Sequence, residues 1–128
     1  MTLHSRPPAG LDGVVAAATA LSHVDGAEGR LIIAGAQVDD LAGQLSFEGL
    51  TARLWSLASG SPIGEATVRH SLGVARARTF ERLPAILAAA EGLPVVAGVR
   101  AGVAALGPVG GLPDEAVLVG AMPVIAAA

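Results

Sequence analysis

The sequence has no cysteine and very few aromatic residues. Without cysteine it can form neither a disulfide framework nor a thiolate metal site. The only aromatic side chains are Phe47, Trp55 and Phe80, and Ala and Gly dominate the apolar positions. Burial of apolar surface contributes roughly 25 cal/mol per Å², and each small side chain removes little area from water. A core made of them needs close backbone approach, many packed elements or a partner surface.

Charge is also sparse. Charged residues make up 15% of the 128 residues against 52% hydrophobic, which argues against disorder and indicates one domain. The net charge of -3 argues against a polyanion-binding role. Arg76, Arg78 and Arg82 form the only local basic cluster, without interleaved aromatics, which is typical of a solvated helix face. We therefore expect no nucleic-acid partner.

No segment has the length of a membrane span. The longest apolar run, residues 116–128, has 13 residues and contains Pro123, whereas a span needs roughly 20. Residues 1–9 contain two consecutive prolines and no apolar stretch of the signal-peptide kind, which predicts a flexible lead-in. We expect a soluble, cytoplasmic protein without a membrane partner.

The N-terminal region predicts a β-hairpin. Val14–Leu21 mixes β-branched residues with alanine and fits either a strand or the start of a helix. Asp25–Gly29 has the glycines and aspartate of a turn, and Arg30–Gly35 is typical of a short strand closed by glycine. The turn between two apolar runs favours the hairpin.

Two adjacent carboxylates, Asp39 and Asp40, lie where a helix is expected to begin. Such a pair could bind a metal or share a proton, but no other acid or histidine lies at ligand spacing. We expect the two carboxylates to stabilise the positive end of the helix dipole, by about 0.3–1 kcal/mol each.

A capped amphipathic helix follows. Ser46 is a good N-cap, Leu45 and Leu50 occupy hydrophobic-staple positions, and Gly60 with Pro62 ends the helix. One face of this helix is expected in the core, with Phe47, Leu54 and Trp55 contributing most. That face consists of Phe47, Leu50, Thr51, Leu54, Trp55 and Ala58.

Further helices are expected over residues 64–78, 84–91, 94–106 and 113–128. The 63–82 stretch is polar and weakly periodic, so it is the least informative. The fold class is thus mainly α, with an N-terminal β-hairpin followed by about five to six helices. On the 94–106 helix, Gly98 and Gly102 form a small-xxx-small pair, which indicates close contact with another helix.

The last helix is apolar on nearly every side, which predicts burial on all sides. Its pattern continues to Ala128 without a C-cap or a basic last turn, which predicts an incomplete domain.

No catalytic, cofactor-binding or metal-binding residue is predicted. His4, His23 and His70 share no metal-ligand spacing, and no nucleophile, base and oxyanion group are brought together by any motif. The glycine-rich stretch Gly107–Gly111 lacks the preceding strand and the following Lys-Ser or Lys-Thr of a phosphate loop.

The order of the N-terminal motifs resembles citrate synthases, especially the bacterial citrate/2-methylcitrate synthase type, which open with a pattern like GLEGV…T.IS.IDG..G.L.YRGY.I.DLA…SFEE…LLW. The matching residues are Gly10-Leu11-Asp12-Gly13-Val14, Thr19, Ser22, Asp25-Gly26, Gly29, Leu31, Gly35, Asp40-Leu41-Ala42, Ser46-Phe47-Glu48 and Leu54-Trp55. Two later segments are similar to that family's H-P-M-D-x-x-R helix and "MPTIVAA" helix, namely Leu93–Leu106 and Asp114–Ala127.

The sequence departs from that family in three respects. Ile33-Ala34-Gly35-Ala36 replaces Y-R-G-Y, and Leu93 replaces the histidine of H-P-M. The family's G-P-L-H-G and G-x-G-H-R histidines, its active-site aspartate and its substrate-binding arginines have no counterpart here, so no catalytic residue is carried over. The resemblance implies that residues 10–128 are the N-terminal, incomplete part of an all-α large domain. Acetyl-CoA would be a substrate of the full-length family, not a cofactor of this chain.

The resemblance also implies a partner, because the family works as a helix-packed dimer. We expect a homodimer or a C-terminal complementing chain, through helices near 94–106 and 114–128. Two functions follow as hypotheses: the scaffold and dimerisation portion of a citrate synthase-type acyltransferase, inactive alone, or a non-catalytic oligomerisation module derived from that scaffold. A small helical domain of unrelated function is the third possibility.

Overall fold

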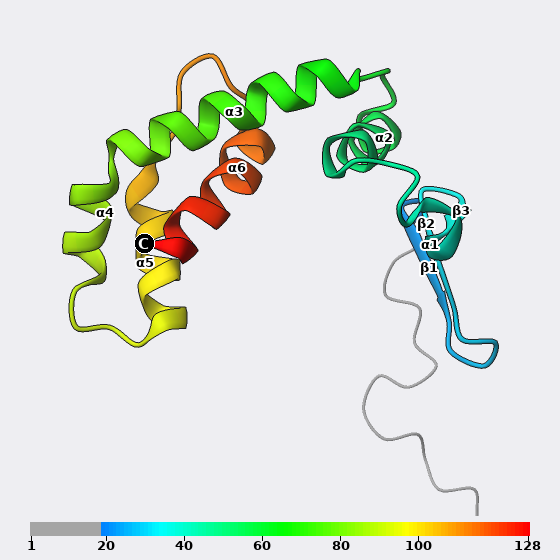
Figure 1. Cartoon of the computed structure of the whole chain (residues 1–128), viewed down its shortest axis with the longest axis horizontal. Coiled ribbons are helices and arrows are strands. Elements are labelled where there is room, and N and C mark those ends of the chain that lie inside the picture. Colours follow the sequence, from blue (N-terminus) through cyan, green and yellow to red (C-terminus); the bar gives the residue numbers. More distant parts are fainter. Residues whose placement is uncertain (1–18) are drawn as a thin grey trace, which may run out of the picture.

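The computed structural model describes residues 19–128, which form a small antiparallel sheet followed by six helices (Figure 1). The predicted mainly-α class with an N-terminal hairpin is therefore confirmed. The strands are β1 (Ser22–Asp25), β2 (Arg30–Ile33) and β3 (Ala36–Gln37), in the order β1-β2-β3. The helices are α1 (Val38–Leu41), α2 (Phe47–Ser59), α3 (Glu65–Glu81), α4 (Leu83–Ala90), α5 (Val95–Leu106) and α6 (Asp114–Ala127).

The hairpin turn lies where the sequence predicts it. β1 and β2 pair in register from Ser22↔Ile33 to Asp25↔Arg30. The Asp25 carboxylate accepts hydrogen bonds from the backbone N–H of Glu28 (3.1 Å) and from the Arg30 guanidinium (3.0 Å). These two bonds, that from Glu28 foremost, hold the pKa of Asp25 below its usual value, because both favour the charged carboxylate.

The first strand differs from the prediction. It lies at Ser22–Asp25 rather than within 14–21, of which residues 14–18 lie outside the described part of the chain, as do residues 1–9. A third strand, β3, was missed. The chain reverses at Ala34 (φ 48°) and Gly35 (φ 78°), two consecutive left-handed residues of the kind found in tight hairpin turns. Alanine, unlike glycine or asparagine, does not indicate a left-handed residue, so the sequence does not predict this turn.

Helices α1 and α2 begin as predicted. Asp39 and Asp40 lie in the first turn of α1. Ser46 caps α2, its hydroxyl accepting from the backbone N–H of Gly49 at 2.9 Å, and Gly60 (φ 69°) ends that helix. The predicted burial of Phe47 is wrong, because 59% of it is exposed.

The buried side of α2 faces α3. Thr51 and Ala52 are buried on α2, and Trp55 is half-buried against a cluster of Ala52, Val68 and Leu72. Among residues 19–128 the side of α2 on which Phe47 lies is left exposed, so the apolar character of Phe47 does not by itself place it in the core.

The least informative stretch of the sequence forms the central helix. Along α3, Val68, Leu72, Ala75 and Thr79 form a row at i, i+4, i+7 and i+11, and each is at most 1% exposed. The Thr79 hydroxyl donates to the Ala75 carbonyl at 2.8 Å, so its burial leaves no polar atom without a partner. The predicted helix of residues 64–78 is extended to Glu81.

Helices α3 and α6 lie against each other along the top of the molecule (Figure 1) and make its most extensive contact. A Cβ placed on Gly120 would lie 2.6 Å from the Cβ of Ala75 and 3.1 Å from the carbonyl oxygen of Leu72. Ala116, one helical turn before Gly120, is also fully buried. The two backbones can approach this closely because Gly120 has no side chain.

The glycine pair on α5 faces neighbouring helices as its spacing predicts, with a close contact at Gly102 and an ordinary van der Waals contact at Gly98. A Cβ on Gly102 would lie 2.9 Å from methyl groups of both Ile86 on α4 and Ile125 on α6, and one on Gly98 would lie 3.5 Å from Ala90. These contacts lie within the chain. The pair therefore explains how α5 packs between α4 and α6, and it requires no second chain.

The expectation that α6 is buried on all sides is wrong. Val117, Ala121 and Ile125 pack into the core with Ile86 and Leu106. On the opposite side of α6, Leu118 is 48% and Met122 44% exposed. Within residues 19–128, α6 makes its most extensive contacts with α3 and α5, and these leave one side of it exposed.

Gly120→Ala tests the α3–α6 contact. The added methyl would overlap Ala75, so the substitution is expected to lower the free energy of unfolding by roughly 1–3 kcal/mol. Gly73→Ala is the matched control, since Gly73 is exposed on α3 with no atom within 4 Å of the added Cβ. It should stabilise the protein by about 0.5–1 kcal/mol through helix propensity. Urea unfolding followed by circular dichroism measures both, and equal effects would contradict the packing described.

Trp55→Ala tests the α2–α3 contact. Because Trp55 is half-buried, the expected loss is roughly 1.5–3 kcal/mol, less than for a core tryptophan. Phe47→Ala, on the exposed side of the same helix, should cost under about 1 kcal/mol. Thermal unfolding compares the two variants, and a larger effect at Phe47 would reverse the assignment of faces.

Candidate functional site

The histidines do not come together into a site. His23 lies exposed on β1 and His70 lies exposed on α3, while His4 is outside the described residues. Asp39 and Asp40 are exposed on α1. Between residues 19 and 128 there is no group of three or more His, Asp or Glu side chains that could hold a metal ion.

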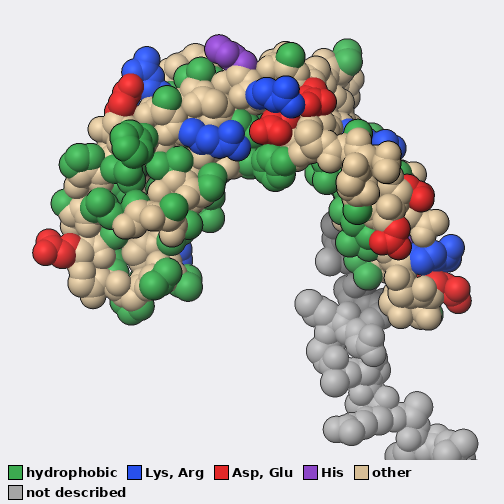
Figure 2. Space-filling view, viewed as in Figure 1, with side chains coloured by type: hydrophobic (Ala, Val, Ile, Leu, Met, Phe, Trp, Pro, Cys, Tyr) green, Lys and Arg blue, Asp and Glu red, His purple; other side chains and the backbone are tan. Residues whose placement is uncertain are grey.

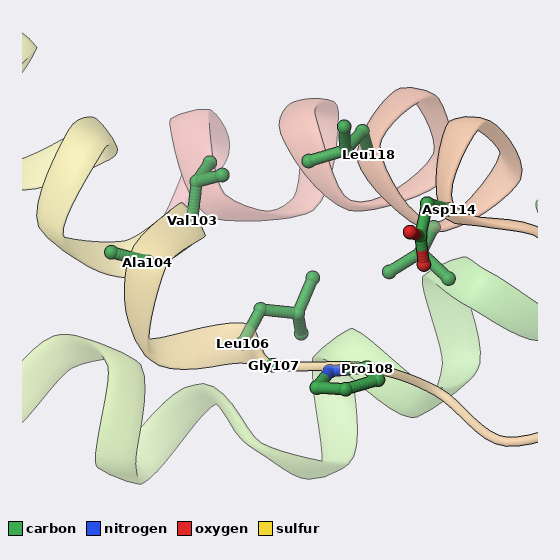
Figure 3. Close-up of a pocket in the computed structure, with 8 residues that line it drawn as sticks. Val103, Ala104, Leu106, Gly107, Pro108, Asp114 and Leu118 are labelled. Carbon is green, nitrogen blue, oxygen red and sulfur yellow. The ribbon is translucent and has the colours of Figure 1, made fainter.

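A pocket lies between α5 and the start of α6, and we call it the α5–α6 groove (Figure 3). Its volume is about 310 Å³, at the lower end of the range for small-molecule sites. Leu106 and Leu118 extend into it from the two helices, and Asp114 lies at the end where α6 begins. The lining residues are Val103, Ala104, Leu106, Gly107, Pro108, Asp114, Val117 and Leu118.

A second depression of about 300 Å³ lies on the other side of α6, between it and the end of α2. We call it the α2–α6 groove; its lining is Trp55, Ala58, Ser59, Ile63 and Glu115. Ser59 is engaged locally, since its hydroxyl accepts from the N–H of Ser61 at 3.3 Å. Each groove is therefore an apolar surface with a single carboxylate.

Charged side chains elsewhere link α2 to α3. The Ser46 hydroxyl donates to the Glu65 carboxylate at 2.8 Å, and Arg69 pairs with the same carboxylate at 2.6 Å. Arg76 lies 4.0 Å from Glu48. Each of these groups thus has a partner within the described residues, and Figure 2 shows that charged side chains lie along the outer surface of the helical part.

Two arginines hold backbone carbonyls at chain reversals. Arg53 donates from Nε (3.1 Å) and Nη2 (2.9 Å) to the carbonyl of Ala34, which fixes the sheet against α2. Arg82, between α3 and α4, donates to the carbonyl of Leu106 at the end of α5. A cation at the C-terminal end of a helix is favoured by the helix dipole. Arg82 thus joins three helices at one corner.

The lining of the two grooves in the described residues is mainly apolar. Neither groove contains a histidine or a second carboxylate, so neither brings a base and an acid to one bound molecule. The sequence did not predict the grooves. Each groove joins residues from two helices, so no spacing within one segment indicates it.

Membrane insertion finds no support among residues 19–128, where no helix combines the length and the apolar character that crossing a bilayer requires.

One comparison with known proteins gives a result. A family model described as "Citrate synthase, C-terminal domain" matches residues 10–128. That description names the C-terminal domain, whereas the motif order predicts an N-terminal segment. The placement within the family protein and the 2-methylcitrate subtype therefore stay predictions. No curated protein and no solved structure matches the chain.

Arg82→Met tests the corner of α3, α4 and α5. Methionine keeps part of the aliphatic stem but removes the bond to the Leu106 carbonyl, so we expect a loss of about 1–2 kcal/mol. Arg78→Met, which removes only an exposed pair with Glu81, should cost under about 0.5 kcal/mol. Denaturant unfolding measures the free energy of unfolding of both variants. If Arg82→Met costs no more than Arg78→Met, Arg82 does not hold the corner.

Proposed function

Because the chain belongs to the citrate synthase family, we propose that it is the N-terminal scaffold portion of a citrate synthase-type acyltransferase. That enzyme condenses acetyl-CoA or propionyl-CoA with oxaloacetate and releases citrate or 2-methylcitrate and CoA. The observation that carries the proposal is the family match over residues 10–128. The order of motifs from Gly10 to Trp55 supports the N-terminal placement.

A scaffold role fits the distribution of polar groups. The condensation needs a base that enolises the thioester and a group that polarises the keto carbonyl, both on one bound substrate pair. Among the described residues each of the two grooves offers one carboxylate, and neither is lined by a histidine. We propose that the catalytic histidines and aspartate belong to residues outside these 128.

The scaffold also needs a partner surface. On α5, Val95 is 82% and Val96 74% exposed, and on α6, Leu118 and Met122 are about half exposed. Covering such side chains would contribute roughly 25 cal/mol per Å² of apolar surface removed from water. This supports association through these two helices, with a second copy or with a complementing chain.

The test is release of free CoA from acetyl-CoA and oxaloacetate, followed with a thiol reagent. The reagent reports only CoA, because the chain has no cysteine. The folded 128-residue chain alone is expected to give no release above the buffer rate. Turnover by the pure chain would overturn the proposal.

A complementation experiment tests whether activity can be restored. The chain is co-expressed with a segment that carries the family's G-P-L-H-G and G-x-G-H-R motifs, and the assay is repeated. Restored CoA release supports the scaffold role, and Gly120→Ala should lower it by weakening the α3–α6 contact. Failure of a folded, associated pair to turn over would count against the acyltransferase assignment.

The second candidate is a non-catalytic helical oligomerisation module, favoured by the same exposed side chains of α5 and α6. It predicts a stable dimer of the chain alone. Light scattering separates the two: a folded dimer without any other chain favours the module, whereas a monomer, or aggregation relieved by a complementing chain, favours the scaffold.

A further inference from the structure

The small sheet and α1 form a unit that packs mainly on itself. Strand β2 pairs with both other strands, and α1 packs against β2 and β3. Among the described residues, none of these four elements makes an extensive contact with α2–α6. In Figure 1 the unit lies beyond α2, away from α4, α5 and α6. We call this unit, residues 21–41, the arm.

One side chain links the arm to α2. Arg53 donates from Nε (3.1 Å) and Nη2 (2.9 Å) to the Ala34 carbonyl. Within residues 19–128 this is the only hydrogen-bonded or ionic contact between the arm and α2–α6. The polar groups at the start of α2, Ser46 and Glu48, have their partners on α3 instead. The position of the arm against α2 therefore depends on a single guanidinium group.

The carbonyl that Arg53 binds is held in place within the arm. Ala34 has a φ of 48°, a left-handed conformation that is unfavourable for alanine, and it is buried. Its N–H donates to the Leu21 carbonyl at 2.8 Å, which is also in the arm. The turn of the arm thus determines the direction of the Ala34 carbonyl. A bond to this carbonyl fixes the orientation of the whole arm and not only of one loop.

The connection between the arm and α2 contains a residue about which the chain can rotate. Residues 42–46 are exposed, Gly43 has a φ of 75°, and no atom lies within 4 Å of a Cβ built on it. Glycine reaches both signs of φ at little steric cost, so rotation at Gly43 requires no repacking of neighbours. Two backbone bonds span Gly43, from the N–H groups of Gln44 and Leu45 to the Leu41 carbonyl. Because Gln44 and Leu45 are exposed, water can replace these bonds.

We propose that the Arg53–Ala34 bond is a clasp that holds the arm against α2, and that the arm swings as a unit about Gly43 when the clasp opens. Three observations support this: the arm has its own backbone hydrogen bonds, one polar link to α2 and an exposed glycine turn after it. Regions with few buried contacts and exposed hydrogen bonds are those that open first. The proposal is independent of the acyltransferase assignment, because it concerns the conformation of the chain and no turnover.

The test measures the distance between two spin labels by electron–electron double resonance. Because the chain has no cysteine, Glu28→Cys at the hairpin turn and His70→Cys on α3 provide two unique and exposed labelling positions. With Arg53 present, one narrow distance distribution is expected. Arg53→Met keeps part of the aliphatic stem but cannot donate, so it should broaden the distribution by roughly twofold or more.

Two controls locate the effect. Arg69→Met removes another exposed arginine, whose ion pair with Glu65 does not involve the arm, and it should leave the distribution narrow. A label pair within the helical part, His70→Cys with Glu91→Cys, should keep its distribution when Arg53→Met is added.

Hydrogen exchange distinguishes a swinging arm from an unfolded one. In Arg53→Met the N–H groups of Ala34 and of the β1–β2 ladder should exchange as slowly as in the unaltered chain, because their acceptors lie within the arm. Fluorescence of Trp55 should also stay unchanged, since Trp55 packs against the cluster between α2 and α3.

The proposal fails on any of the following results. A narrow Glu28–His70 distribution in Arg53→Met would show that other contacts hold the arm. A broad distribution in the unaltered chain would show that the clasp does not hold it. Broadening of the His70–Glu91 pair would show general loosening, and lost exchange protection in β2 would show that the arm unfolds and does not swing.

Discussion

The close approach of α3 and α6 at Gly120 is the constraint on which the rest of the structure depends. A Cβ at this position would lie 2.6 Å from Ala75, so the two backbones meet almost without intervening side chains. Gly102 repeats the arrangement for α5, between Ile86 and Ile125. A chain with three aromatic residues cannot separate its helices with bulky groups. It packs through small residues instead, and dispersion contacts between backbones replace those of large side chains.

Packing through small residues leaves a thin core. The largest fully buried side chains among the described residues are only Leu72, Ile86, Val68 and Thr79. Such a core can cover one side of each helix but not two, so long aliphatic residues remain on the other side of α6 and at the start of α5. The poverty in aromatics and the exposed apolar surface thus have the same cause. Figure 2 shows hydrophobic side chains spread over the surface of the helical part rather than confined to its interior.

Local chemistry was enough to predict the hairpin turn, the Ser46 cap, the Gly60 stop and the close contacts of Gly98 and Gly102. Each depends on a side chain or a φ angle within a few residues. The sequence does not show that α3 is the central helix. Ala75 is small and Thr79 is polar, so neither is recognised as a core residue before the contact with α6 is known. The prediction for Phe47 was wrong for the opposite reason: the side chain is apolar, yet its side of α2 is exposed among the described residues. The grooves join residues from α2, α5 and α6, and no spacing along one segment shows them.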